Sequence, residues 1–236
     1  MDFKRKRIRV LVDAWSMIAQ GKAKTREEVI ELLKKLYEEN GVDPLRGASK
    51  PADLYEKDLM SLYIIGKWGL GLDKDLPPEV FERIFTVESR YEKAAEALIN
   101  YEDPHEVRDK VTSALRGLQL DGPIMARILR FAFTLHYYGF LDRKEFEKAL
   151  RNAYKAFPEL EDTIRRFAKF YIAYRIGEEL VKGSVKNKLE LDVLRNTVAL
   201  EVGIPKAVPK LGYVIDVAKA FFTLPKKILQ LKNKKS

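Results

Sequence analysis

The C-terminal stretch TLPKKILQLKNKKS, Thr223 to Ser236, interleaves lysines with apolar residues. A lysine ammonium neutralises phosphate as a mobile point charge, and each neutralised phosphate releases counterions. We therefore predict that residues 204–236, which hold eight lysines and no arginine, contact nucleic acid. The lysines concerned are Lys206, Lys210, Lys219, Lys226, Lys227, Lys232, Lys234 and Lys235.

Two other interpretations of this pattern stay open. An amphipathic helix that lies on anionic lipid has the same mixture of lysines and apolar residues. A solvated terminal helix that packs on its own protein has it too.

The N-terminus, MDFKRKRIRV, is almost as basic. Its cations fall in the first turns of a predicted helix over residues 4–20, where the macrodipole disfavours positive charge. This departure from a local rule indicates that the charges serve a partner outside the helix. The predicted nucleic-acid contacts here are Lys4, Arg5, Lys6, Arg7 and Arg9.

Two further stretches could contact phosphate. The loop 41–53 presents Arg46 and Lys50 among glycines and prolines, which suits an irregular RNA surface. The stretch IIGKWGLGL contains Gly-Lys-Trp-Gly, the GXXG pattern that clamps a nucleotide backbone in KH domains, so Lys67 and Trp68 become candidate contacts. The strands of a KH domain are missing, and the alternative is a helix end at which the glycines allow close packing and left-handed turns and Trp68 fills the core.

The sequence offers no catalytic residues, metal ligands or cofactor site that we would predict. It has no cysteine and two histidines, which excludes thiolate and disulfide chemistry and makes histidine-based sites improbable. His136 sits on an apolar helix, as a hydrogen-bonded core residue would. Carboxylates such as Glu92, beside Lys93 and Glu96, read as a solvated helix face. We expect a protein that is not an enzyme.

The net charge is unevenly distributed. Residues 1–9 carry +4 and residues 182–236 carry +8, which leaves −3 for the stretch between them out of a total of +9. Basic ends on a slightly acidic body point to a polyanion, either nucleic acid or an anionic membrane. Frayed, solubilising termini are the alternative.

Helical periodicity runs through nearly the whole chain and predicts an all-α fold, an irregular bundle of about ten helices. Thr25 with Glu28, Asp103 with Glu106 and Asp142 with Glu145 read as helix N-terminal caps, and Ser184 could cap another helix. The predicted helices cover residues 4–20, 25–40, 53–65, 78–100, 104 onward, 123–138, 142–157, 158–181 and 184–202, followed by two short ones.

We expect a helical body over residues 1–203, with a weak boundary near 100–104, and a basic helical extension over 204–236. No apolar run is long enough for a membrane span, and the N-terminus lacks a signal-peptide layout, so we expect a cytoplasmic protein.

Three stretches, RIRVLVDAWSMI, PLRGASKPADLYEKDLMSLYIIGKWGLGLD and FERIFTVESRYEKAAEAL, carry a resemblance. They are similar to an uncharacterised family of small basic proteins from thermophilic archaea, over roughly the first hundred residues. The resemblance implies a cytosolic archaeal protein and transfers no catalytic motif. Abundant Lys, Glu and Arg with few thermolabile residues agree with a thermophilic source.

These observations lead to one functional hypothesis and its alternatives. We expect an RNA-binding protein, an accessory or structural component of the archaeal ribosome that contacts rRNA phosphates and neighbouring ribosomal proteins. The alternatives are a DNA-binding or chromatin-associated helical protein and a peripheral membrane protein held by its C-terminal segment. The oligomeric state stays open.

Overall fold

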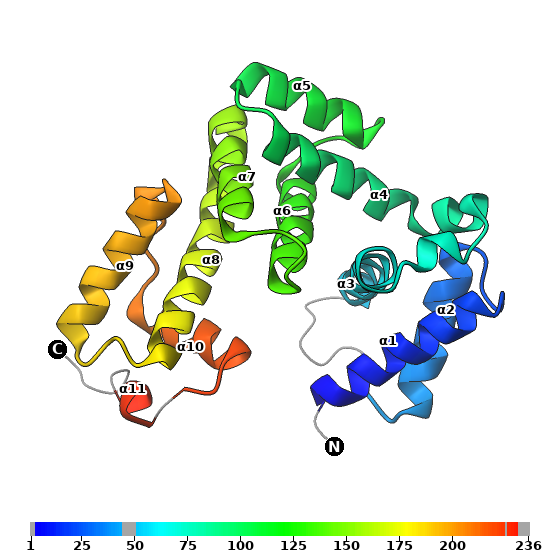
Figure 1. The fold of residues 1–236 in the computed structure, drawn as a ribbon, viewed down its shortest axis with the longest axis horizontal. Helices are drawn as coiled ribbons and strands as arrows, with labels where there is room; N and C mark the ends of the chain where they lie inside the picture. The colour runs from blue at the N-terminus through cyan, green and yellow to red at the C-terminus, as the bar shows by residue number, and fades with distance from the viewer. Residues whose placement is uncertain (1–2, 44–50, 225, 231–236) are drawn as a thin grey trace. The chain divides into compact units, whose positions relative to one another are not determined.

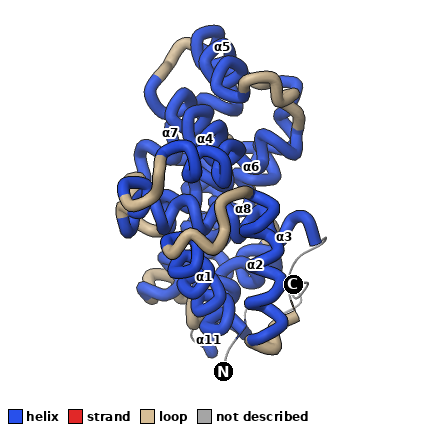
Figure 2. The backbone as a smooth tube through the Cα atoms, turned by 90° about the vertical axis from the view of Figure 1, so that its right-hand side faces the viewer, coloured by secondary structure: helices blue, strands red, loops and turns tan. Residues whose placement is uncertain are grey.

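The computed structural model describes residues 3–43, 51–224 and 226–230, and every described secondary-structure element in these ranges is helical (Figures 1 and 2). The all-α prediction is confirmed. The chain forms two compact units: unit 1 comprises Met1–Lys93 and Phe133–Leu141, and unit 2 comprises Ala94–Ala132 and Asp142–Ser236.

Unit 1 is built from α1 (Phe3–Ala19), α2 (Arg26–Glu39), α3 (Pro51–Ile64), the π-helix η1 (Ile65–Leu70), the 3-10 turn η2 (Leu72–Lys74), most of α4 (Pro78–Asn100) and the end of α6 (Gly122–Tyr137). α1 packs on α2 and α3. The buried ring of Phe85 on α4 contacts two other buried aromatic rings, with centroid distances of 5.7 Å to Trp15 of α1 and 5.6 Å to Tyr63 of α3.

Unit 2 is organised around α8 (Glu161–Lys182), which packs against three other helices. These are α7 (Arg143–Ala156), α9 (Lys188–Val202) and α10 (Leu211–Phe221) (Figure 1). α5 (Pro104–Leu115), η3 (Pro158–Leu160), η4 (Pro205–Ala207) and α11 (Lys226–Gln230) complete it. A Cβ on Gly177 of α8 would lie 3.0 Å from both Ala218 and Phe222, so α10 approaches α8 closely because this position lacks a side chain.

Local capping chemistry fixes several helix ends as predicted. Asp142 and Glu145 form a reciprocal capping box at α7, and Asp103 accepts from the backbone amides of His105 and Glu106 at α5. Gly183 ends α8 in the left-handed conformation at φ 76°. Each of these ends is set by neighbours in sequence, so the sequence suffices to locate it.

One local prediction was wrong, and a second is confirmed in part. The cap of α9 is Asn187, whose side chain accepts from Glu190, while Ser184 donates its hydroxyl to the carbonyl of Glu179. At α2, Thr25 accepts from the amide of Glu28 as expected, but the Glu28 carboxylate accepts from the amide of Lys24, one residue before the cap.

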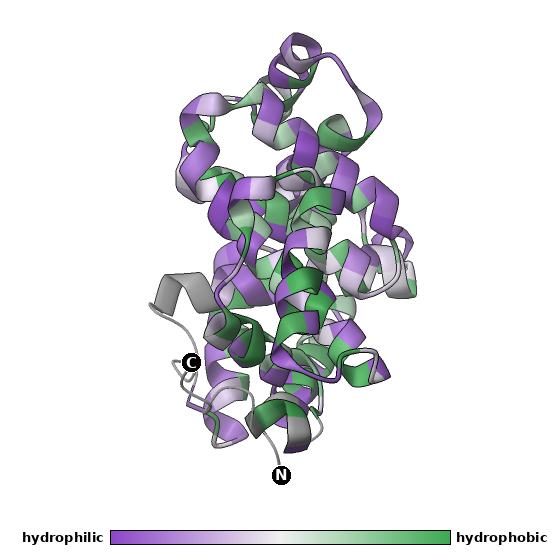
Figure 3. Cartoon of the chain, turned by 90° about the vertical axis from the view of Figure 1, so that its left-hand side faces the viewer, coloured by the Kyte–Doolittle hydropathy of each residue, from purple (hydrophilic) through white to green (hydrophobic). Residues whose placement is uncertain are grey.

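Residues 204–222 are an integral part of unit 2. α10 packs along α8, and its residues Val214, Ile215, Val217 and Ala218 are buried. Hydrophobic and hydrophilic residues alternate along the helices, as in amphipathic helices (Figure 3). The segment is thus anchored by its apolar side, which fixes where its lysines lie.

Candidate nucleic-acid interface

The predicted N-terminal contacts divide between surface and interior. Arg5 and Arg9 are exposed, and Arg9 lies 3.9 Å from the carboxylate of Asp13 one turn later. Lys6 is half-buried and donates to the backbone carbonyl of Asn40. The side chain of Lys4 lies outside the described residues.

Arg7 points into unit 1 and pairs with Asp58 of α3. The Arg7 Nε lies 2.8 Å and Nη2 lies 2.5 Å from Asp58 Oδ1, and the Tyr37 hydroxyl donates to Oδ2 at 2.6 Å. Asp58 is fully buried, and this burial raises its pKa although the Arg7 guanidinium opposes the shift. Because its guanidinium is already bound, Arg7 ties α1 to α3 and has little to offer a phosphate.

Lys67 and Trp68 are held by a buried carboxylate. Glu92 of α4 is 3% exposed and accepts from Lys67 Nζ at 2.6 Å, from Trp68 Nε1 at 2.7 Å and from the Tyr63 hydroxyl. The expectation that Glu92 belongs to a solvated face was wrong. One charge from η1 and one from α4 thus neutralise each other, which joins the π-helix to α4.

The Gly-Lys-Trp-Gly stretch is not a turn between two helices. Residues 65–70 continue α3 as a π-helix, and the left-handed residue is Gly71, at φ 67°. Gly66 is buried against the Trp15 ring, as the close-packing alternative expected. Trp68 does not fill the core, because it is 40% exposed and rests 6.3 Å from the ring of Phe140.

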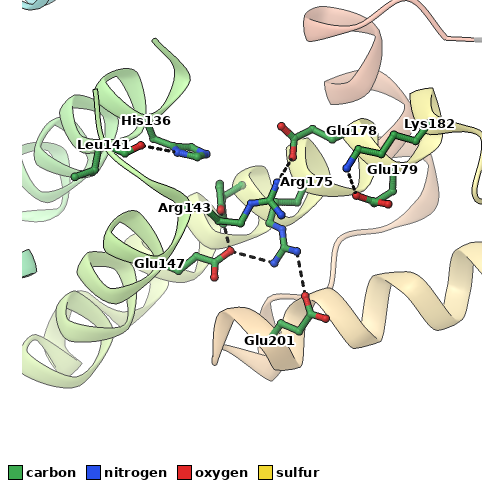
Figure 4. Close-up of polar contacts among 10 residues, drawn as sticks. His136, Leu141, Arg143, Glu147, Arg175, Glu178, Glu179, Lys182 and Glu201 are labelled. Atoms are coloured by element: carbon green, nitrogen blue, oxygen red, sulfur yellow. Dashed lines mark hydrogen bonds and ion pairs between the residues drawn. The ribbon is translucent and has the colours of Figure 1, made fainter. Parts of the chain in front are cut away.

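Cations of unit 2 are also paired within the protein. Arg175 bridges Glu147 and Glu201, with both distances 3.0 Å, and Arg143 contacts Glu178 at 2.9 Å (Figure 4). The Tyr171 hydroxyl donates to Glu147 at 2.9 Å, and burial raises the pKa of that phenol. These contacts join α7, α8 and α9.

The C-terminal lysines have a different setting. Within the described part of the chain, Lys206, Lys210, Lys219 and Lys226 are exposed and none is paired with a carboxylate. Tyr213, three residues after Lys210, is 42% exposed beside them in sequence. The remaining predicted contacts, Arg46, Lys50, Lys232, Lys234, Lys235 and the Lys227 side chain, lie outside the described residues.

The structure adds little that could do covalent chemistry. His136 Nδ1 lies 3.1 Å from the carbonyl oxygen of Leu141, and the side chain is half-buried. Among the described residues no group of three or more His, Asp or Glu side chains is placed to hold a metal ion. None of the described helices is long and apolar enough to cross a lipid bilayer.

Comparison with known proteins identifies a family. The model of a family described as "Uncharacterized protein conserved in archaea (DUF2192)" matches residues 1–231, so the chain belongs to it. The match extends well beyond the first hundred residues that carry the resemblance in sequence. No curated protein and no solved structure gave a significant match.

Proposed function

We propose that this member of the archaeal family is a cytoplasmic RNA-binding protein that contacts phosphates through the basic surface of its C-terminal segment. The observation that carries the proposal is the contrast in how cations are used. Arg7, Arg26 and Arg175, whose side chains are largely buried, each pair with a carboxylate from another helix. The four described lysines of the segment are exposed and have no carboxylate partner.

The apolar side of the segment supports phosphate over lipid as the partner. A helix that lies on a membrane must present an apolar face to it. Here that face is covered by protein, because Val214, Ile215 and Ala218 are fully buried and Leu224 and Ile228 nearly so. The exposed side of the segment carries the four lysines beside Tyr213 and Asp216, and a lysine attracts phosphate without needing an apolar contact.

The distribution of the lysines favours RNA over duplex DNA. Lys206 lies in η4, Lys210 precedes α10, Lys219 is in the last turn of α10 and Lys226 opens α11. The charges are therefore spread over several short elements and do not form a stripe along one helix that could enter a major groove. Such scattered charges suit the irregular phosphate surface of folded RNA, and the proposed RNA is that of the ribosome.

The proposal predicts a salt dependence. If the four described lysines each neutralise one phosphate, log K should fall with log salt with a slope of about −3, at roughly 0.7 per phosphate for single strands. Raising the salt fourfold would then weaken binding about 50-fold.

The test is a filter-binding titration of ribosomal RNA with two charge-matched variants. Replacing Lys206, Lys210, Lys219 and Lys226 by Gln should weaken binding strongly and remove most of the salt slope. The matched control replaces Lys74, Lys93, Lys144 and Lys155, which are also exposed, by Gln. It lowers the net charge equally and should bind nearly as the natural protein does.

Equal losses in the two variants would mean that binding follows net charge alone and would refute the interface. Binding of duplex DNA or of anionic vesicles in preference to RNA would support the alternatives. Sucrose-gradient sedimentation of native lysate at low and high salt tests the ribosomal setting, because the protein should move with a subunit only at low salt.

A further inference from the structure

Unit 1 contains an apolar groove that the RNA proposal does not use. Its volume is about 250 Å³, and its walls include Ile8, Leu11 and Val12 of α1, Ile65 and Leu70 of η1, and Tyr138 after α6. All of these residues belong to unit 1, so the groove is independent of the C-terminal lysines.

The groove opens onto an exposed apolar surface. Ile8 and Val12 are each 61% exposed and Leu70 is 62% exposed, although all three line a concave site. Large aliphatic side chains at a concave surface are typical of a place where another molecule docks. Ile65 and Leu70, the first and last residues of η1, line the groove opposite the residues of α1.

The rim beside α1 is cationic. Arg5, Ile8, Arg9 and Val12 are all exposed and follow one another at helical spacing, so that arginine and aliphatic residues alternate along one stripe. The contact of Arg9 with Asp13 is long and exposed, and a partner carboxylate could replace it at little cost. On the η2 side, Leu72 is followed by Asp73, Lys74 and Asp75, which together carry a net charge of −1, so the surplus of positive charge lies on the α1 side.

The few polar groups of the groove indicate which kind of ligand it can bind. The side chains that line the groove carry three polar groups: the Trp15 N–H, which already donates to Leu62, and the hydroxyls of Ser16 and Tyr138. A nucleobase has polar edges that this lining could not satisfy. Aliphatic side chains of a protein helix need no such partners, and flanking carboxylates would meet the two arginines.

We propose that this groove binds an amphipathic helix of another protein that carries aliphatic anchors on one face and acidic residues beside them. The α1 wall from Ile8 to Ala19 is about 17 Å long at 1.5 Å per residue, which a helix of about twelve residues would cover. The anchors enter between α1 and η1, and the acidic residues lie against Arg5 and Arg9.

The test is fluorescence anisotropy of the full chain with a labelled helical peptide that has leucines at i, i+4 and i+7 and glutamates beside them. A second peptide has the same leucines with lysines in place of the glutamates. The acidic peptide should bind saturably and the basic one at least about tenfold more weakly. The preference should shrink as salt rises.

Variants locate the binding. Val12→Glu should weaken the acidic peptide about tenfold or more, and Val12 is exposed enough that the fold tolerates the change. Val193→Glu is the matched control, since Val193 is 58% exposed and lies in a separate hollow of unit 2. The pair Arg5→Glu and Arg9→Glu should abolish the preference for the acidic peptide.

Several outcomes would overturn the proposal. One is no saturable binding of the acidic peptide, or equal binding of the two peptides. Another is a loss on Val193→Glu as large as that on Val12→Glu, which would place the peptide elsewhere. A dimer of the protein alone that Val12→Glu dissociates in sedimentation would mean that a second copy covers the groove. If the Arg5 and Arg9 variants lose RNA binding as strongly as they lose the acidic peptide, the surface belongs to RNA.

Discussion

Gly66 is the position where one methyl group would test the packing of the π-helix. A Cβ there would lie 1.8 Å from Cζ2 and 2.4 Å from Cη2 of Trp15, whereas non-bonded carbons approach to about 3.5–4.0 Å. The indole would have to move by roughly 2 Å. It has little room, because Trp15 is 4% exposed and its Nε1–H donates to the carbonyl of Leu62 at 2.9 Å.

The expected cost follows from these contacts. Overpacking of this kind costs about 1–3 kcal/mol and the strained or lost hydrogen bond about 1 kcal/mol more. We therefore expect Gly66→Ala to lower the free energy of unfolding by about 2–4 kcal/mol. Urea unfolding followed by circular dichroism and by tryptophan fluorescence measures the change.

Gly69→Ala is the matched control, three residues along the same π-helix. Its Cβ would lie 3.6 Å from Phe140, an ordinary contact, so the substitution should be neutral or stabilising by up to about 1 kcal/mol. Equal effects of the two substitutions on the free energy of unfolding would contradict the close packing of Gly66 against the Trp15 ring. A loss of RNA binding in both variants without a loss of stability would instead restore the GXXG interpretation.

Three further predictions concern the buried polar groups. Glu92→Gln should lower the free energy of unfolding by about 3 kcal/mol in urea titrations, because a carboxamide cannot accept from three donors. The control Glu82→Gln, at an exposed position on the same helix, should have almost no effect. Because burial raises the pKa of Tyr171, the folded state keeps a proton that the unfolded state loses above about pH 10. The free energy of unfolding should therefore fall above that pH by up to about 1.4 kcal/mol per pH unit. Thermal melts at a series of alkaline pH values measure this slope, which should be shallower in Tyr171→Phe. Asn152→Leu should cost about 1–3 kcal/mol in the same urea assay, since it removes the donors to the Leu98 and Tyr101 carbonyls. An unchanged urea midpoint for Glu92→Gln or for Asn152→Leu would contradict the contacts of that residue, and an unchanged slope in Tyr171→Phe would contradict the shift at Tyr171.

The sequence locates the helices well because their ends are decided locally. Asp103 and Asp142 cap helices through amides two or three residues away, and Gly183 ends one by its own conformation. The π-helix could not be predicted in this way. It depends on Gly66 meeting Trp15 and on Lys67 and Trp68 meeting Glu92, contacts that join residues 24 to 51 positions apart.

Distance along the chain also explains why the sequence misassigned Arg7 and Glu92, which have partners inside unit 1. In sequence, Arg7 is one cation among five and Glu92 has Lys93 and Glu96 for neighbours. In the structure, their partners are Asp58, 51 residues away, and Lys67, 25 residues away. Only tertiary structure can distinguish a cation that stabilises the fold from one that is left for a partner.

The C-terminal surplus of charge is the exception, because it follows from composition. Residues 204–236 contain eight lysines and a single carboxylate, Asp216, so the segment cannot neutralise itself. Its apolar side is fixed on α8, and the α8 carboxylates Glu178 and Glu179 already pair with Arg143 and Lys182. The lysines therefore remain available to a partner, and anchoring lowers the entropy that such a partner would have to offset on binding.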